Sequence, residues 1–429
     1  MRILITGVHG FVGSNFSAML AGDHTVFGLD IVAPENPNVA QTYSWQDLEE
    51  GRLPDVDAVV HLAAMVHDIK KAANEEAYYA VNTGLTKKIY DWFLQSKAKM
   101  FIFFSTVKAV ADSVEGILTE DVIPSPVGAY GNSKLQAEAY ILGHPAADKL
   151  VYILRPCMIH GSGNKGNLPL LFNLVRKGIP WPLGAYENLR TFTSIGNVRF
   201  AVKSLLEKSV PSGIYNLGDD EPVSTNRLIR MICASQGRKA RIWRLPKWLI
   251  SAVAWAGGLL HLPLNPERLQ KLTENYVSSN AKLKAALGVD KMPVSAEEGL
   301  EMTFKAFSNE WFLHLRDASG RALYGGRAAF LGYRQPLRPY ARQWLRAGGG
   351  GLQASSEWQC GRRNRQRRGG VAARRLRMAG RSISRLRFGK QGRGSVGGSG
   401  DRRALWRHPL ESASPRRRDD APRTRVPGL

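Results

Sequence analysis

The sequence is poor in cysteine. Its 429 residues contain only three, Cys157, Cys233 and Cys360, and no two of them form a CxxC pair. This spacing argues against a disulfide framework and against a zinc site. His61 and His67 have no carboxylate or cysteine partner at ligand spacing, so we expect no metal site.

Long hydrophobic runs are also scarce. The longest covers residues 248–264, and Gly257, Gly258, His261 and Pro263 interrupt it. A membrane-spanning helix needs about 20 apolar residues, so this run predicts a buried or amphipathic helix and no membrane span. The chain opens with MRILITG, without a charged and apolar leader, which favours a cytoplasmic protein.

Lysine and acidic residues almost disappear from residues 316–429. This segment holds 27 arginines but one lysine, six of the 36 acidic residues and 19 of the 43 glycines. Residues 1–315 therefore carry a net charge of only +2, and we expect no nucleic-acid partner for them. The apolar residues of the segment follow neither a 2-residue nor a 3.6-residue period, which predicts a disordered basic tail.

The tail has two competing explanations. One is out-of-frame translation of a GC-rich coding sequence, which would produce arginine and glycine without structural periodicity. The other is a functional Arg/Gly-rich segment that binds RNA or anionic surfaces. The basic cluster RRNRQRRGG at 362–370 stands alone rather than repeating. A small domain of unfamiliar type is disfavoured by the missing periodicity.

Apolar runs and helical patterns alternate along the first 160 residues. The sequence predicts strands at 2–6, 25–31, 57–64, 100–106 and 150–156, and helices at 11–20, 84–97 and 129–142. This alternation is typical of right-handed βαβ units, in which helices cover both faces of a parallel sheet. We therefore expect an α/β protein of the doubly wound, Rossmann type.

Three glycines in TGVHGFVG, at 6–13, follow the first expected strand and open the first expected helix. Gly7 allows a tight turn, Gly10 lets the backbone approach a pyrophosphate, and Gly13 lets the helix pack against the strand. The phosphates would lie on the N–H groups of the helix N-terminus. Asp30 ends the next strand and can bond the ribose hydroxyls, which predicts NAD rather than NADP.

Tyr130 and Lys134 form a YxxxK pair at the start of an expected helix. A spacing of four residues places the phenol and the ammonium on one helix face. The ammonium would lower the pKa of the phenol, as a general base acting on an alcohol requires. Thr106 ends a preceding strand, at the edge of an open α/β sheet where ligands bind.

At this point the sequence resembles the extended short-chain dehydrogenases/reductases, in their NAD-dependent epimerase/dehydratase branch. The residues that carry the resemblance lie in family order across about 1–307: TGVHGFVG, Asp30, HLAA at 61–64, VNTGLT at 81–86, FFSTVKAV at 103–110, YGNSK at 130–134, RPCMIHG at 155–161 and YNLGDDEPVS at 215–224. The resemblance implies NAD as cofactor, a nucleotide-sugar substrate, and a homodimer formed through the helices near 84–97 and 131–143.

The resemblance also implies roles for individual residues. It makes Thr106, Tyr130 and Lys134 the catalytic triad. It implies that the cofactor is bound by Gly7, Gly10, Phe11, Val12, Gly13, Asp30, Leu62, Ala63, Ala64, Asn82, Tyr130, Lys134 and Pro156. It implies that the substrate is bound by Thr106, Asn167, Arg190 and Arg268, of which Asn167 and the two arginines would contact its diphosphate.

Some positions depart from the family pattern. Thr106 replaces the usual serine, and Thr191, Ser194 and Gly196 stand where Asp, His and Asp are usual. These differences lie near the expected sugar pocket. They resemble a subgroup of polysaccharide-assembly enzymes that includes 4-epimerases and 4-ketosugar reductases.

We therefore expect an NAD-dependent epimerase that inverts C4 of a UDP-hexose or UDP-N-acetylhexosamine through a transient 4-keto sugar. The alternative is an NAD(P)H-dependent 4-ketosugar reductase. A dehydratase is disfavoured because Val107-Lys108 stands where that chemistry uses an Asp-Glu pair. A non-catalytic NAD-sensing scaffold is disfavoured because it would have no use for an activated phenol.

The same motifs predict how the chain is divided. Residues 1–156 would form the NAD-binding Rossmann domain. Residues 157–310 would form a smaller α/β substrate-binding part, interleaved with late Rossmann elements such as a strand at 213–218. Residues 316–429 would be the tail.

Overall fold

Seven parallel strands form the central sheet. The structure, a computed structural model, describes residues 1–66, 75–164, 166–259 and 265–314. Across the sheet the strands are β11 (Gly213–Leu217), β7 (Leu150–Pro156), β5 (Met100–Phe104), β4 (Ala58–His61), β1 (Arg2–Thr6), β2 (Thr25–Leu29) and β3 (Gln41–Tyr43). The chain moves outward from β1 in one direction and outward from β4 in the other, which confirms the expected doubly wound α/β class.

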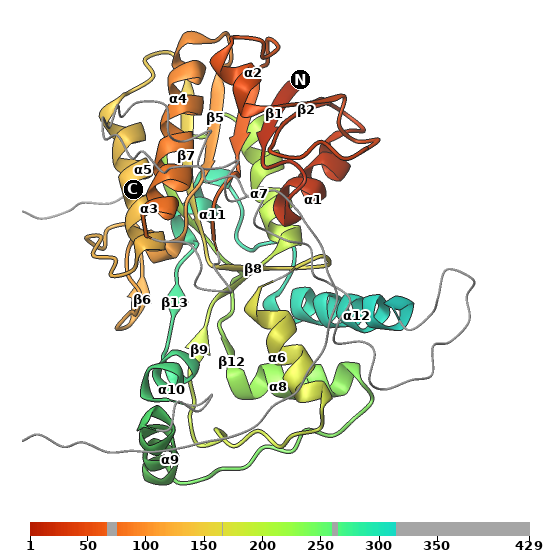
Figure 1. The fold of residues 1–429 in the computed structure, drawn as a ribbon, viewed down its shortest axis with the longest axis vertical. Coiled ribbons are helices and arrows are strands. Elements are labelled where there is room, and N and C mark those ends of the chain that lie inside the picture. Colours follow the sequence, from red (N-terminus) through yellow and green to blue (C-terminus); the bar gives the residue numbers. More distant parts are fainter. Residues whose placement is uncertain (67–74, 165, 260–264, 315–429) are drawn as a thin grey trace, which may run out of the picture. The chain divides into compact units, whose positions relative to one another are not determined.

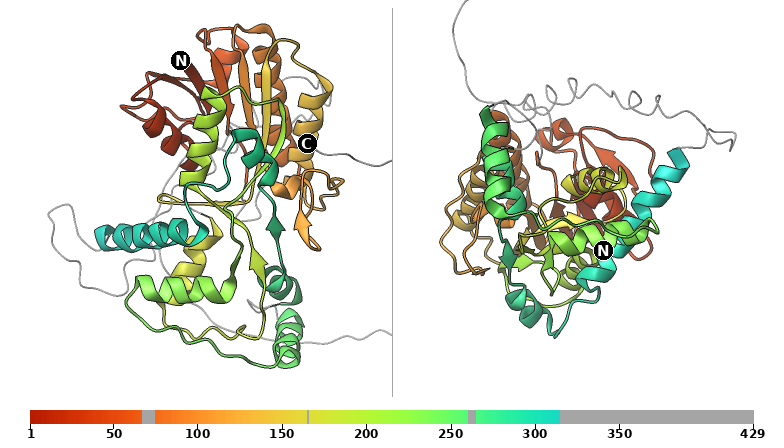
Figure 2. Two further views of the ribbon diagram at one scale, coloured as in Figure 1. Left: turned by 180° about the vertical axis from the view of Figure 1, so that it is seen from behind. Right: turned by 90° about the horizontal axis from the view of Figure 1, so that it is seen from below.

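Helices cover both faces of this sheet (Figure 1). One face carries α1 (Phe11–Leu20), α7 (Ile195–Glu207) and α11 (Ala281–Leu287), and the other carries α2 (Trp45–Glu49), α4 (Leu85–Gln95) and α5 (Ala129–Gly143). Strand β1 shows how the sequence produces this arrangement, since its side chains alternate between the faces. Ile3 and Ile5 pack in the core beneath α1 and α7, whereas Leu4 packs in the core beneath α4. Seen from behind, α7 runs beside α1 (Figure 2).

A second group of helices packs around its own apolar core. It consists of α6 (Asn167–Arg176), α8 (Thr225–Ser235), α9 (Lys247–Leu259), α10 (Pro266–Thr273) and α12 (Ala296–His314). Ser224 caps the start of α8, because its side chain accepts a hydrogen bond from the Arg227 N–H.

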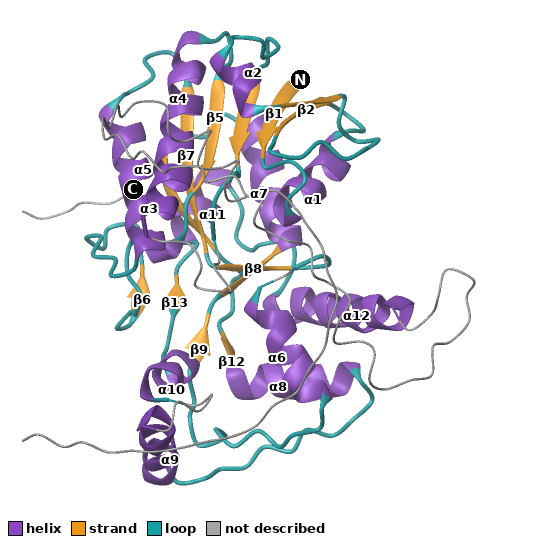
Figure 3. Cartoon of the chain, viewed as in Figure 1, coloured by secondary structure: helices purple, strands orange, loops and turns teal. Residues whose placement is uncertain are grey.

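Three short strand pairs lie between the sheet and these helices (Figure 3). They are β8 (Met158–His160) with β10 (Phe192–Ser194), β9 (Leu189–Arg190) with β12 (Val223–Ser224), and β6 (Ile117–Leu118) with β13 (Val277–Ser278). The remaining elements are α3 (Glu75–Tyr78), the π-helix η1 (Tyr79–Gly84) and the 3₁₀-helix η2 (Val107–Ala109).

Three further points concern a membrane span, the basic tail and the domain boundary. Within the described ranges, no helix combines the length and the hydrophobicity that a membrane crossing requires. The tail expected at 316–429 lies outside the described residues. Division of the chain at residue 156 stays a prediction.

Candidate active site

The glycine-rich loop lies at the point where the strand order reverses. At the end of β1, Thr6 is paired with Leu29 of β2 on one side and with His61 of β4 on the other. Gly7 then turns the chain with a φ of 69°, a left-handed conformation that favours glycine. A Cβ on Gly13 would lie 2.3 Å from the Gly7 carbonyl oxygen, so only glycine lets α1 pack this closely on the loop.

Helix α1 begins directly after this turn. Its N-cap is Gly10, which has no side chain to bond the N–H groups of the first helical turn. Those N–H groups therefore remain for a ligand, and the helix dipole favours an anionic one.

Asp30 follows β2 beside the loop. Its Oδ2 accepts a hydrogen bond from the His9 N–H at 3.0 Å, and its Oδ1 accepts one from the Ile31 N–H at 2.7 Å. The carboxylate is buried, and these bonds fix it next to the glycine turn.

A pocket of about 700 Å³ opens at the carboxyl ends of the central strands. It brings together most of the side chains expected from the sequence: Gly7, Gly10, Phe11, Val12, Gly13, Leu62, Ala64, Thr106, Tyr130, Lys134, Pro156, Asn167 and Arg190. Asp30, Ala63 and Asn82 were also expected to bind the cofactor, but they are buried and do not line the pocket. Asn82 is fully buried, donates to the Met65 carbonyl and the Ser133 hydroxyl, and so connects the loop after β4 to helix α5.

Tyr130 and Lys134 occupy the first turns of α5, as the spacing predicted. Burial raises the pKa of Tyr130 to about 12, although a hydrogen bond with Thr106 works against this. Lys134 is almost completely buried, and its Nζ donates to the Phe104 carbonyl at 2.7 Å. Burial lowers the pKa of Lys134 to about 7, while Glu138 acts to raise it. The lowered phenol pKa that we expected is thus not found, because desolvation dominates.

A buried polar group one turn further along α5 was not expected from the sequence. Glu138 is paired with Arg155 of β7, with an Oε2–Nη2 distance of 2.6 Å, and it also accepts a hydrogen bond from Ser105. Since Ser105 precedes Thr106 and Arg155 precedes Pro156, this pair fixes two strand ends that line the pocket. Glu138 lies eight residues after Tyr130 on the same face of α5. This spacing is the one feature of the sequence that could have indicated that Glu138 lies near the expected active site.

The substrate side of the pocket is formed by elements far apart in the sequence. Arg190 of β9 lies 3.6 Å from Glu274, and both line the pocket together with Lys108 and Tyr276. The Lys108 ammonium lies 4.4 Å from the centre of the Tyr276 ring. Sequence reasoning missed Glu274 and Tyr276 as pocket residues. Arg268 belongs to α10, but its side chain lies outside the described residues.

Cys157 also lines the pocket. Burial raises the pKa of its thiol to about 12, which keeps the sulfur protonated and argues against a nucleophile. His61 is enclosed between the hydroxyls of Thr6 and Thr86 at 2.6 and 2.9 Å, and His67 lies outside the described residues. Among the described residues, no three potential metal-binding side chains form a cluster.

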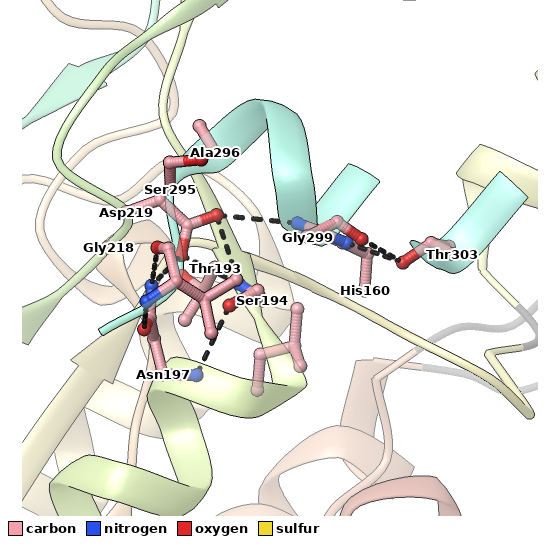
Figure 4. A network of polar contacts seen from close by, with 12 residues as sticks. His160, Thr193, Ser194, Asn197, Gly218, Asp219, Ser295, Ala296, Gly299 and Thr303 are labelled. Carbon is pink, nitrogen blue, oxygen red and sulfur yellow. Dashed lines mark hydrogen bonds and ion pairs between the residues drawn. The ribbon is translucent and has the colours of Figure 1, made fainter. Parts of the chain in front are cut away.

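A buried polar network around Asp219 connects β8 and β10 to helices α7 and α12 (Figure 4). Asp219 accepts hydrogen bonds from the Ser194 N–H at 2.9 Å and from the Asn197 side chain at 2.7 Å. His160 lies between Asp219, at 3.4 Å, and Thr303 of α12, at 2.9 Å. Both His160 and Asp219 are buried, so the network ties β8, β10, α7 and α12 into one unit.

The pocket residues fit a dinucleotide. The uncapped turn of α1 suits a pyrophosphate, and Tyr130 and Lys134 line the same pocket. Asp30, held beside the glycine turn by the His9 N–H, suits a ribose at the end of β2.

Comparisons with known proteins agree with this arrangement. A family model described as the NAD dependent epimerase/dehydratase family matches residues 3–218. The chain is 30% identical over 324 residues to UDP-glucose 4-epimerase of Vibrio cholerae, covering 71% of this chain and 95% of the relative. It is 28% identical over 254 residues to N-acetyl-alpha-D-glucosaminyl-diphospho-ditrans,octacis-undecaprenol 4-epimerase of Escherichia coli O157:H7, covering 57% and 75%.

The fold is similar to that of UDP-glucuronic acid 4-epimerase from Bacillus cereus, solved in complex with NAD. The TM-score is 0.57 at 22% sequence identity, and the similarity covers 72% of this chain and all of that one. The glycine turn at the sheet's switch point, the family model over residues 3–218 and the similarity to the Vibrio enzyme lead to one conclusion: the chain is an enzyme of the NAD-dependent epimerase/dehydratase family.

Proposed function

We propose that this enzyme binds NAD and inverts C4 of a UDP-hexose or UDP-N-acetylhexosamine. The observation that carries the proposal is the convergence of Thr106, Tyr130 and Lys134 in the pocket that the glycine-rich loop also lines. Sugar 4-epimerases among the relatives support the choice of carbon. One relative is named for UDP-glucose and the other for an N-acetylglucosaminyl-diphospho-undecaprenol. Both names describe a sugar carried on a diphosphate.

In this proposal the glycine turn and the first turn of α1 hold the pyrophosphate of NAD, and Asp30 bonds the adenosine ribose. The bound cofactor supplies the hydride acceptor and donor for C4. Tyr130 takes the proton from the sugar 4-hydroxyl and returns it after the sugar has turned. Thr106, which hydrogen-bonds Tyr130, orients the reacting oxygen.

The phenol of Tyr130 needs a nearby positive charge, since burial alone holds its pKa at about 12. Lys134, on the same face of α5, is the residue that would supply it. Glu138 supports the charged form of this lysine.

Arg190 and Asn167 would hold the diphosphate of the substrate. Both line the pocket, and a guanidinium fork suits phosphate oxygens. Anchoring at this remote group lets the 4-keto sugar turn without leaving the site. The ion pair between Arg190 and Glu274 would open to admit the diphosphate.

Incubation of the purified protein with NAD and a panel of sugar diphosphates tests the proposal. The panel contains UDP-glucose, UDP-N-acetylglucosamine, their C4 epimers, dTDP-glucose and N-acetylglucosamine diphosphoryl polyprenol. An epimerase forms the C4 epimer with no net change at the NADH absorbance band. A second incubation, with NADH and a UDP-linked 4-keto sugar, tests the alternative: consumption of one NADH per product would instead establish the reductase.

We also propose a homodimer formed through α4 and α5. These two helices pack beside each other, and a Tyr140–Asp91 hydrogen bond of 2.6 Å joins them. Light scattering on the purified protein measures its mass and decides between monomer and dimer.

A further inference from the structure

Helix α9 presents an apolar face to solvent. Trp248, Trp255 and Leu259 are 72%, 68% and 70% exposed, and their spacing of seven and four residues places them on one side of the helix. The opposite side, with Ile250 and Ala254, is buried in the core of the helical part. Exposed apolar side chains of this size on one helix face indicate an interaction surface.

A basic segment leads into this helix. Residues 238–259 contain five basic residues and no acidic one: Arg238, Lys239, Arg241, Arg244 and Lys247. All five are exposed. Arg238 bonds backbone carbonyls, and the Arg244 guanidinium lies 3.8 Å from the exposed Glu187 carboxylate. The side chains of Lys239 and Arg241 extend the positive charge along the same segment.

The basic segment has a fixed position. The backbone N–H of Trp181 donates to the Arg241 carbonyl at 2.8 Å, and the backbone N–H of Trp243 donates to the Trp181 carbonyl at 2.8 Å. This pairing holds residues 241–243 against the described body of the chain. Trp243 adds a third exposed indole, 54% accessible, between the charges and the helix.

We propose that the exposed face of α9, together with residues 238–247, docks on the surface of an anionic lipid membrane. Tryptophan and leucine would enter the boundary between headgroups and acyl chains, while the basic side chains would contact the lipid phosphates. The described part of the helix has 13 residues, about 20 Å of rise, against a hydrocarbon core of roughly 30 Å. Gly257, Gly258 and Pro263 interrupt the apolar run of the sequence here. It would therefore lie in the membrane surface and not cross it.

The positive charge of residues 238–247 favours an anionic membrane over two other partners for this face, the basic tail and a second copy of the chain. Residues 316–429 carry a net charge of +22 by sequence, so the basic segment would repel them. A second copy docking through the same face would bring two basic segments together. An anionic surface is the occupant that complements both the indoles and the charges.

Docking would also bring the pocket close to the lipid. Helix α10 packs against α9 and ends at Thr273. The next residue, Glu274, lines the substrate side of the pocket.

Flotation of the full chain with vesicles tests the proposal. One set contains phosphatidylcholine alone, and the other also contains phosphatidylglycerol. Because the basic tail adds its own attraction to anionic vesicles, the decisive comparison is between full-length variants at equal salt. The test variant is Trp248→Gln with Trp255→Gln. The control is Ile123→Gln with Val127→Gln, which removes two apolar side chains that are 86% and 85% exposed elsewhere.

We expect the protein to float with the anionic vesicles. The tryptophan variant should lose about tenfold or more of its partition coefficient, as the removal of two interfacial indoles implies, and the control should keep it. A second variant, Lys239→Gln with Arg241→Gln, should weaken binding to anionic vesicles and leave the thermal transition unchanged.

Three results would overturn the proposal. The wild-type protein could fail to float with either vesicle. The tryptophan variant could float as well as the control, which would assign all binding to the tail. The tryptophan variant could instead have a lower mass in light scattering than the wild-type protein. This would show that the exposed face of α9 binds a second copy of the chain.

Discussion

Tyr130 is the residue on which the proposed chemistry depends most directly. Tyr130→Phe keeps the ring in its buried place and removes the proton carrier. We expect turnover to fall by about a hundredfold to ten-thousandfold, the range for general acid–base groups. NAD affinity should change little, as measured by cofactor titration. Turnover close to that of the wild type would refute the assigned role.

The burial of Lys134 predicts how the stability of the protein depends on pH. Its pKa is lowered to about 7 in the folded protein, chiefly by burial, from 10.5 when exposed. Between these values the unfolded chain binds more protons, so the free energy of unfolding rises with pH there, by at most about 1.4 kcal/mol per unit. Lys134→Met removes this contribution. Urea unfolding from pH 7 to 10 should show a shallower pH dependence for the variant, and parallel curves would contradict the burial argument.

The sequence predicted which side chains meet in the pocket better than it predicted their surroundings. Thr106, Tyr130 and Lys134 were expected because a four-residue helical spacing and a strand end can both be read from the chain. The pairing of Glu138 with Arg155 could not be read this way, because it joins a helix to a strand 17 residues away through tertiary packing. The pKa of Tyr130 was predicted in the wrong direction, since desolvation depends on the whole buried environment.

At the scale of elements, Asp219 holds four of them together. Its carboxylate accepts bonds from Ser194 and Asn197 and faces His160, all in a buried region. Asp219→Ala would leave these donors without their acceptor, and we expect a loss of about 2–4 kcal/mol in the free energy of unfolding.

Urea denaturation measures this loss. The control is Asp148→Ala, an exposed position where we expect a change within about 0.5 kcal/mol. Equal stability of the two variants would show that the network contributes nothing.

Elements with a long, regular pattern were predicted well. The helix expected at 84–97 contains α4, and the strand expected at 213–218 is β11. The pairs β8–β10 and β9–β12 were missed, since two or three residues carry no periodicity. The apolar run at 248–264 was expected to form a buried or amphipathic helix; its described residues lie in α9, which buries Ile250 and Ala254 on one side and exposes apolar side chains on the other.

At the scale of the molecule, one face of the sheet is completed by residues from far along the chain. The core on that face combines Ile3 and Val60 with Val198, Leu205 and Met292. A fragment of residues 1–156 lacks the last three and would expose their apolar partners. We expect it to unfold without cooperativity, whereas a chain ending at residue 315 should unfold cooperatively and keep full activity.

Urea and thermal unfolding of the two fragments, with an activity assay on the longer one, check this expectation. Cooperative unfolding of residues 1–156 alone would show that the predicted boundary at residue 156 separates an autonomous domain. Loss of activity on truncation at 315 would show that the basic tail contributes to function.

Helix α7 covers strands that precede it by more than 130 residues in the sequence, and this has a consequence during translation. Ribosomes add about 5–20 residues per second, and α7 begins at Ile195, whereas β4 ends at His61. At that rate, roughly 7 to 27 seconds pass between the synthesis of β4 and the start of α7, and during this time α7 cannot cover its face of the sheet. For that interval the nascent chain carries an uncovered strip of isoleucine and valine, a binding site for chaperones that act at the ribosome.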